Sequence, residues 1–237
     1  MDRIDKIISS SLSITRSEAR DAVKHGRVCV NGKTVKSPAE KADAQKDKIT
    51  VDNNEIVFCE FVYIMMNKPK GVISSTDGKK TNEKTVIDIL PENMKRRNLF
   101  PAGRLDKNTT GFILITDDGK FAHDILSPKK HISKTYIAEL DKPFDSEVET
   151  AFSKGVVIGE DVCLPALLES VNDSRTTARV TISQGMYHQI KRMFSVFGIE
   201  VVELKRIKMG KLELDENLLP GECRYLSKEE LNLIKER

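Results

Sequence analysis

The sequence contains no tryptophan and only four cysteines among its 237 residues. The cysteines, Cys29, Cys59, Cys163 and Cys223, lie far apart, and no two of them form a C-x-x-C pair. This spacing indicates neither a zinc site nor a disulfide framework. Since Cys29 and Cys59 stand within apolar runs, we expect them to be buried thiols of a protein in a reducing compartment.

Long apolar segments are also missing from the sequence. No stretch approaches the roughly 20 apolar residues that a membrane-spanning helix needs. The N-terminus, MDRIDKIIS, lacks the apolar core of a secretory signal peptide. We therefore expect a cytoplasmic protein with no membrane partner.

Motifs that hold cofactors or catalytic metals are absent as well. The sequence has no G-x-G-x-x-G, P-loop, H-E-x-x-H or G-x-S-x-G motif, and its four histidines are scattered. We expect neither a metal nor a nucleotide cofactor, so that any chemistry falls to carboxylates, hydroxyls and amines.

Acidic and basic residues nearly balance, with 39 of Lys and Arg against 36 of Asp and Glu and a net charge of +3. Attraction to a polyanion must therefore depend on where the charges lie. Residues 1–36 carry eight basic and four acidic residues, a net charge of +4. This segment is either a basic partner surface or an ordinary pair of solvated helix faces.

Residues 1–58 are expected to form a first domain of two helices and a small sheet. Apolar residues recur at helical spacing over residues 3–12, and the capping-box tetrapeptide TRSE at 15–18 begins a second helix. The dipeptide Asn31-Gly32 predicts a tight hairpin turn, and residues 51–58 predict a further strand.

From residue 61 to residue 237 the pattern changes to short strands and short helices. Several strand-like segments follow one another without a helix between them, which favours an α+β domain with a largely antiparallel central sheet and flanking helices over a doubly wound parallel sheet. The expected helices cover residues 118–126, 145–152, 187–197 and 227–236. The expected strands are YIMMN, GVISS, GFILIT, KTYIAEL, VVIG, ALLESV, TARVTIS and VVELKRIKMG.

One acid, Asp106, stands between Arg104 and Lys107 in the segment PAGRLDKNTTGFILITDDG at residues 101–119. An aspartate in a loop is commonly a structural turn residue. However, two cations flank this one, and the loop adjoins a strand that reads as buried, which is a rigid support of the kind that carries functional loops. The alternative to a turn residue is therefore a functional carboxylate in a basic loop.

Three further segments are candidates for the same site. Tyr136 lies on the strand face opposite Thr135 and Ile137, either as a core residue or as a functional ring. In SQGMYHQIKRMFSVFG, at 183–198, an apolar helical stripe leaves Lys191 at its margin, able to reach a cleft, and turns Arg192 toward solvent or a phosphate. The loop TDGKKTNEK at 76–84 is a solvated flap or a phosphate clamp.

Together these segments resemble the RsuA-like group of pseudouridine synthases, which act on ribosomal RNA. Residues 2–50 are similar to the S4-like RNA-binding domain. The matching motifs, in the order of the family, are NKPKGVISS at 67–75, GRLDKNTTG at 103–111, KTY at 134–136 and GMYHQIKRM at 185–193. The resemblance spans nearly the whole chain and departs from the family pattern at Phe112, Ile113 and Met186. It implies a cofactor-free isomerisation of uridine to pseudouridine by base flipping.

The resemblance also implies a role for each matching residue. Asp106 would be the catalytic carboxylate, Tyr136 the ring that stacks on the uracil, and Lys191 the cation paired with Asp106. Around this site, RNA would be held by Arg104, Lys107 and Arg192. In the S4-like domain the implied RNA contacts are Arg16, Arg20, Lys24 and Arg27.

The substrate and the class of protein leave alternatives open. A uridine of 16S ribosomal RNA is the expected target, and the same reaction on 23S ribosomal RNA is the alternative. A different class is a non-catalytic ribosome-binding or assembly factor, which would need only the S4-like domain. The expected partner is ribosomal RNA, free or within a ribosomal subunit assembly intermediate, and the protein is expected to act as a monomer.

Overall fold

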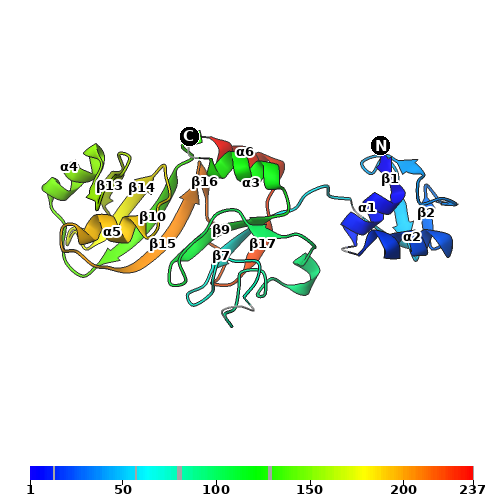
Figure 1. Ribbon diagram of the computed structural model, residues 1–237, viewed down its shortest axis with the longest axis horizontal. Coiled ribbons are helices and arrows are strands. Elements are labelled where there is room, and N and C mark those ends of the chain that lie inside the picture. The colour runs from blue at the N-terminus through cyan, green and yellow to red at the C-terminus, as the bar shows by residue number, and fades with distance from the viewer. Residues whose placement is uncertain (13, 57, 79–81, 128–129, 237) are drawn as a thin grey trace. The chain divides into compact units, whose positions relative to one another are not determined.

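The computed structural model describes residues 1–12, 14–56, 58–78, 82–127 and 130–236. The chain forms two compact units, residues 1–62 with 92–98 and residues 63–91 with 99–237 (Figure 1). The sequence pattern placed 92–98 in the second domain. In the structure, the Arg96 guanidinium donates hydrogen bonds to the carbonyls of Cys59 (2.8 Å) and Glu60 (3.0 Å), and these bonds tie the segment to the first unit.

The first unit is a helical hairpin followed by a small antiparallel sheet. Apolar side chains of both helices and of the sheet form its core, in which Ile4, Ile7 and Ile8 are fully buried. A four-stranded sheet has the order β3-β2-β5-β6, and β1 pairs with β4. The elements are α1 (Ile4–Ser11), α2 (Arg16–Lys24), β1 (Asp2–Arg3), β2 (Val28–Val30), β3 (Lys33–Thr34), β4 (Lys41–Ala42), β5 (Ile49–Val51) and β6 (Asn54–Glu55), and a 3-10 turn, η1, covers Glu92–Met94.

The turns of the first unit show which local signals were reliable. The capping box is confirmed, because Thr15 accepts from the Glu18 amide while the Glu18 carboxylate accepts from the Thr15 amide. Asn31-Gly32 is confirmed as the hairpin turn, with φ of 51° and 79°. The strand predicted over 51–58 is confirmed only in part: Asp52 and Asn53 have positive φ and turn the chain between β5 and β6, so the strand within this range is Asn54–Glu55, and residue 57 lies outside the described residues.

The second unit is built on a nine-stranded sheet with the order β13-β14-β10-β15-β9-β7-β17, to which β8 and β16 add at β9 and β15. Among the strand pairs of the described chain, only β9 and β15 run parallel, so the largely antiparallel sheet is confirmed. The strands are β7 (Tyr63–Lys68), β8 (Phe100–Pro101), β9 (Thr110–Thr116), β10 (Lys134–Leu140), β13 (Leu167–Ser170), β14 (Thr177–Ile182), β15 (Val201–Met209), β16 (Leu212–Glu213) and β17 (Cys223–Tyr225), and β11 (Val157–Ile158) pairs with β12 (Asp161–Val162).

Four helices flank this sheet: α3 (Gly119–Leu126), α4 (Ser146–Lys154), α5 (Gln189–Ser195) and α6 (Lys228–Lys235). Helix α4 contacts β13, α5 contacts β15 and β11, and α6 contacts β16, near which α3 also lies (Figure 1). Asp118, Asp145 and Ser227 accept hydrogen bonds from backbone amides at the starts of α3, α4 and α6. These caps explain why three predicted helices begin where they do.

Two further sequence expectations are corrected by the second unit. The segment GVISS is not a strand, since it forms only an isolated bridge between Ile73 and Thr85. Helix α5 begins two residues later than expected, because His188 has a left-handed backbone (φ 50°, ψ 33°) that ends the preceding turn.

The cysteines differ from the expectation of buried thiols. Cys59 is exposed and Cys29 is half-buried, so that prediction is wrong for both. Cys163 is buried, and burial raises the pKa of its thiol. Within the described ranges, no cluster of three or more His, Cys, Asp or Glu could hold a metal ion, and no helix is long and apolar enough to cross a membrane.

Gly111 allows the close approach of the two parallel strands. A Cβ at this position would lie 2.2 Å from the backbone oxygen of Arg206 on β15, and the Gly111 φ of 95° also favours glycine. The loop that precedes β9 therefore enters the sheet directly beside β15. This approach positions Asp106 next to the cavity described below.

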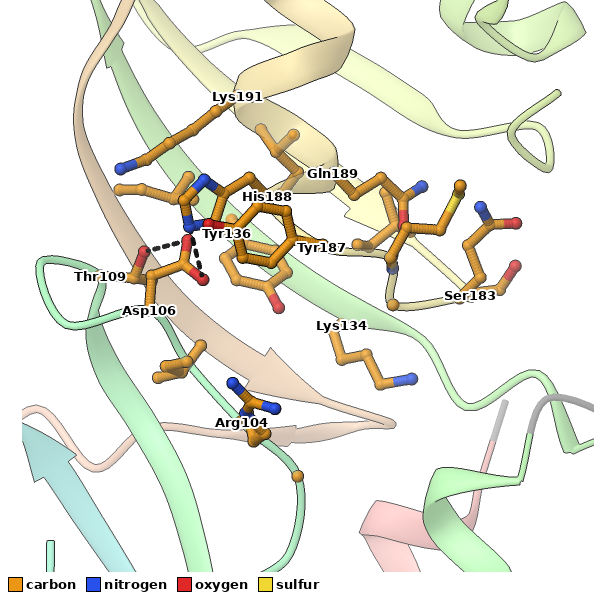
Figure 2. Close-up of a pocket in the computed structure, with 18 of the residues that line it drawn as sticks. Arg104, Asp106, Thr109, Lys134, Tyr136, Ser183, Tyr187, His188, Gln189 and Lys191 are labelled. Carbon is orange, nitrogen blue, oxygen red and sulfur yellow. Dashed lines mark hydrogen bonds and ion pairs between the residues drawn. The ribbon is translucent and has the colours of Figure 1, made fainter. Parts of the chain in front are cut away.

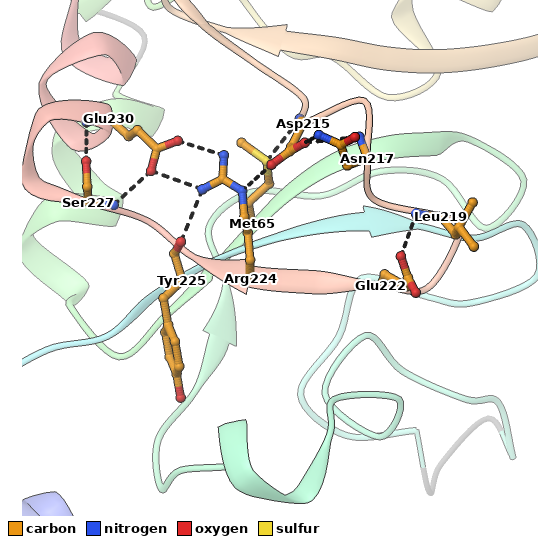
Figure 3. A network of polar contacts seen from close by, with 9 residues as sticks. All are labelled: Met65, Asp215, Asn217, Leu219, Glu222, Arg224, Tyr225, Ser227 and Glu230. Atoms are coloured by element: carbon orange, nitrogen blue, oxygen red, sulfur yellow. Dashed lines mark hydrogen bonds and ion pairs between the residues drawn. The ribbon is translucent and has the colours of Figure 1, made fainter.

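The C-terminal part of the second unit is joined by an ionic network (Figure 3). Arg224 of β17 contacts Asp215 at 2.5 Å and Glu230 of α6 at 2.7 Å. Hydrogen bonds from Asn217 and Arg224 hold the pKa of Asp215 below its usual range. One guanidinium thus links β17, the segment after β16 and the start of α6.

Candidate active site

A cavity of about 750 Å³ opens in the second unit, lined by the loop before β9, by β10 and by the turn that leads into α5. Four residues selected from the sequence line it: Arg104, Asp106, Tyr136 and Lys191 (Figure 2). They come from three segments that are far apart in the chain. The fold therefore brings the main candidates into one concave site.

The Asp106 carboxylate is 31% exposed and is held by two long contacts. Its Oδ1 lies 3.5 Å from Nε2 of His188, and its Oδ2 accepts a hydrogen bond of 3.5 Å from the Thr109 hydroxyl (Figure 2). Strong hydrogen bonds to carboxylates are shorter, about 2.7 to 2.9 Å. The carboxylate is thus oriented but remains accessible from the cavity.

Lys68, at the end of β7, supports the Asp106 loop from within the protein. Its side chain is fully buried, and its ammonium donates to the carbonyls of Pro69 (3.1 Å), Lys107 (3.1 Å) and Thr109 (2.9 Å). Burial lowers the pKa of Lys68 to about 8, while the charge of Asp106 acts in the opposite direction. The motif NKPKG was recognised in the sequence, but no role was predicted for this lysine.

Lys191 lies on the first turns of α5 and lines the cavity, and in Figure 2 its side chain extends to one side of Asp106 without a contact to the carboxylate. No ion pair between Lys191 and Asp106 occurs among the described residues. His188 occupies the place beside the carboxylate instead, and its ring stacks on Tyr187 with centroids 3.9 Å apart. His188 was not singled out from the sequence, since its backbone conformation carries no sequence signal.

Tyr136 lies within the cavity on β10 and is 8% exposed. Its neighbour Thr135 points to the opposite face of the sheet, where its hydroxyl is 2.9 Å from that of Thr181. In Figure 2 the Tyr136 ring lies between Asp106 and Lys134. The ring can therefore support a flat group placed next to the carboxylate.

Lys134 is a half-buried lysine that the sequence did not single out. It lines the cavity two residues before Tyr136, on the same face of β10. Burial, and then the charge of Arg206, lower its pKa to about 8. Arg206 is itself buried and donates to the Phe112 carbonyl at 2.7 Å.

The other predicted RNA contacts differ in their exposure and in the protein groups that they already contact. Arg104 is exposed beside the cavity, whereas Lys107 forms an ion pair of 2.6 Å with Glu83. Arg192 points to β11, where its guanidinium donates to the Ile158 carbonyl at 3.5 Å, rather than to open solvent. Neither Lys107 nor Arg192 lines the cavity. Lys79 and Lys80 of the 76–84 loop lie outside the described residues.

In the first unit, the four predicted RNA contacts are all exposed: Arg16, Arg20, Lys24 and Arg27. Arg20 also contacts the buried carboxylate of Asp5 at 3.2 Å, and Arg27 lies 3.6 Å from Asp52. Although burial opposes it, hydrogen bonds from Arg3 and Arg20 keep the pKa of Asp5 lowered. Arg20 therefore has a structural contact as well as an exposed surface.

Comparison with known proteins agrees with this geometry. Residues 62–196 match the family model of RNA pseudouridylate synthases, and residues 2–49 match the S4 domain. The chain belongs to the RNA pseudouridylate synthase family, and it is an isomerase that acts on RNA. The resemblance found in the sequence motifs is thereby confirmed.

Individual relatives match over nearly their full length. An uncharacterized RNA pseudouridine synthase of Bacillus subtilis is 44% identical over 237 residues, covering 99% of this chain and 98% of the relative. The ribosomal small subunit pseudouridine synthase A of Escherichia coli is 40% identical over 232 residues, covering 97% and 98%. A crystal structure of a pseudouridylate synthase is 36% identical, with a TM-score of 0.68, and covers 99% of this chain and 100% of that one.

Proposed function

We propose that this protein converts a uridine of the small-subunit (16S) ribosomal RNA to pseudouridine, with Asp106 as the catalytic carboxylate. The observation that carries the proposal is the accessible Asp106 carboxylate in one cavity with the Tyr136 ring. The choice of RNA is supported by relatives named ribosomal small subunit pseudouridine synthase A. Those relatives match this chain in both of its parts.

The reaction rearranges bonds without any net gain or loss of atoms. The bond from N1 of uracil to the ribose breaks, the base turns, and C5 bonds to the same ribose carbon while the proton of C5 is lost and N1 gains one. Asp106 acts either as a nucleophile toward the ribose or as a base that removes a ribose proton. Both routes need the carboxylate in its charged form and the nucleotide out of the RNA stack.

Tyr136 supports the extruded base, and the nearby cations keep the Asp106 carboxylate charged. An extruded uracil loses its stacking neighbours, and the ring of Tyr136 replaces them with an aromatic face. RNA phosphates disfavour a nearby negative charge, and the ammonium groups of Lys68 and Lys191 oppose that effect. We assign Lys191 as the cation that pairs with Asp106 when RNA occupies the cavity.

The remaining basic residues hold RNA. We assign residues 1–58 as the RNA-binding domain and residues 61–237 as the catalytic domain. Phosphate contacts of this kind position an RNA and make its binding depend on salt. The protein acts as a monomer in the cytoplasm, on ribosomal RNA that is free or part of an assembly intermediate. The assigned contacts are Arg16, Arg20, Lys24 and Arg27 in the first domain and Arg104, Lys107 and Arg192 in the second.

Tritium release tests the reaction and the substrate together. Separated 16S and 23S ribosomal RNA, each lacking the modification and labelled with tritium at C5 of uracil, are incubated with the wild-type protein and with Asp106→Asn. We expect release from 16S RNA by the wild type alone, and similar RNA affinity of the two proteins, since the substitution keeps shape and removes charge. Release from 23S RNA only would overturn the substrate, and full activity of Asp106→Asn would overturn the role of Asp106.

A further inference from the structure

His188 connects the start of α5 to the reactive carboxylate. Its Nε2 lies 3.5 Å from Oδ1 of Asp106, and both side chains border the cavity with 37% and 31% exposure. A ring that carries a proton on Nε2 can donate it to this oxygen, whether the imidazole is neutral or charged. The distance is long for a hydrogen bond, and such contacts often tighten only when substrate is bound.

The position of this ring is fixed by its backbone and by a neighbouring ring. The left-handed conformation of His188 is uncommon for a residue with a side chain, and it turns the imidazole toward the loop before β9. The Tyr187 ring covers the imidazole at 3.9 Å with an interplanar angle of 16°. Behind it, Ile190, Met193 and Phe194 anchor α5 in the core.

Other charged groups near the carboxylate do not take this place. All three protons of the Lys68 ammonium are directed to backbone carbonyls, so Lys68 has none left for Asp106. Lys191 of α5, Arg104 of the loop before β9 and Asp161 of β12 line the same cavity, but in the described part of the chain none of them pairs with Asp106. Thr109 reaches only Oδ2.

We infer that His188 is a positioning residue, which orients the Asp106 carboxylate through an Nε2–H donor before and during the reaction. This inference rests on the proposed catalytic role of Asp106. The two oxygens are held from two sides, Oδ1 by His188 and Oδ2 by Thr109, so the carboxylate faces the cavity in one orientation. Loss of His188 should therefore lower the turnover rate rather than the RNA affinity.

Three substitutions of His188 distinguish the effect of its Nε2–H donor from the effects of its ring and of its left-handed backbone. His188→Phe keeps a ring that can stack on Tyr187 but has no donor. His188→Asn suits a left-handed backbone but has a shorter amide, whereas His188→Gln has an amide long enough to reach Asp106. His123→Gln, on the exposed side of α3, is the matched control.

Single-turnover rate constants and RNA dissociation constants are measured for all four variants. We expect His188→Phe and His188→Asn to slow the reaction about tenfold to a hundredfold with RNA affinity within about twofold of the wild type. His188→Gln should recover most of the rate, and His123→Gln should match the wild type. A wild-type rate in His188→Phe, or an equal loss in all three His188 variants together with weaker RNA binding, would overturn the inference.

A second readout does not depend on activity. The ¹⁵N signal of His188 Nε2 is compared by NMR in the wild type and in Asp106→Asn, with His123 as the internal reference. We expect the His188 signal to move and the His123 signal to stay. An unchanged His188 signal would overturn the contact even if the wild type modified no RNA, whereas a moved signal with an inactive wild type would count against the proposed function alone.

Discussion

Lys68 Nζ donates a 2.9 Å hydrogen bond to the backbone carbonyl of Thr109, which lies 41 residues further along the chain. The same ammonium reaches the carbonyls of Pro69 and Lys107, so one buried charge joins the end of β7 to the part of the loop that follows Asp106. A lysine used in this way acts on the backbone rather than on RNA. Its removal takes one donor from each of three carbonyls, of which that of Lys107 still accepts from the Gly71 amide.

Lys68→Met is therefore expected to lower the free energy of unfolding by about 2 kcal/mol and to reduce turnover by about a hundredfold or more. Methionine keeps the length of the side chain, so the loss reflects the donors and the charge. Urea unfolding and tritium release measure the two effects.

Lys70→Met is the matched control for Lys68. Lys70 is exposed and pairs with Glu203, a surface contact that contributes about 0.5 kcal/mol or less. A turnover of Lys68→Met equal to that of Lys70→Met would show that the loop does not depend on the buried ammonium.

Lys134 gives the opposite prediction for stability. Its pKa is about 8 in the folded protein and about 10.4 in an unfolded chain, so the unfolded state binds the proton more tightly. The resulting penalty on folding is fully present below pH 8 and disappears as the pH rises from about 8 to about 10.4. Lys134→Met should be more stable than the wild type at pH 7, and the difference should shrink over this range.

Urea unfolding at several pH values between 7 and 10.5 checks this dependence. Lys142→Met, an exposed lysine, is the control and should show no such trend. A difference between wild type and Lys134→Met that stays constant with pH would mean that Lys134 keeps an ordinary pKa when the protein folds.

Lys191→Met is expected to slow single-turnover pseudouridine formation by about tenfold or more, because the carboxylate loses its compensating cation in the presence of RNA phosphates. RNA affinity should change little. Lys205→Met removes an exposed lysine of β15 that does not line the catalytic cavity, and it should keep the wild-type rate. Equal rates for the two variants would show that Lys191 does not act as the cation paired with Asp106.

The basic surface of the first unit is tested by the salt dependence of binding. Arg16→Gln combined with Lys24→Gln should weaken RNA binding and reduce the slope of log K against log salt by about 1 to 2, since each phosphate contact contributes about 0.7 to 0.9. These two residues are chosen because Arg20 and Arg27 also pair with Asp5 and Asp52.

A double variant of the same charge provides the comparison for that experiment. Lys41→Gln with Lys46→Gln removes two exposed charges outside α2 and its following turn, and it should keep most of the slope. Equal slopes in the two double variants would mean that only the total charge attracts RNA.

Elements with strong local signals were predictable from the sequence. Apolar periodicity and the caps at Thr15, Asp118 and Ser227 located α1, α2, α3 and α6 to within a few residues. Of the segments expected to be strands, 71–75 forms only an isolated bridge, and 51–58 contains a turn at Asp52 and Asn53 before the short strand β6. The strand order was not predicted, since it depends on pairings between distant segments.

Candidate residues of the site were selected from the sequence through their neighbours and through the family motifs. Arg104, Asp106, Tyr136 and Lys191 were selected from the sequence, and the fold places all four on one cavity. Lys68, Lys134 and His188 were not selected, because their places in the site depend on full or partial burial or on a left-handed backbone, and neither is visible in a linear sequence. These three residues are the parts of the site that only the structure supplies.

The pairing of β17 with β7 has a consequence for how the protein is made. Met66 lies opposite Cys223, so the strand that ends in Lys68 obtains one of its two neighbours only from the last part of the sheet to be synthesised. At about 5 to 20 residues per second, about 10 to 30 seconds separate the synthesis of these two strands. The sheet around Lys68 is therefore completed only after β17 has been synthesised.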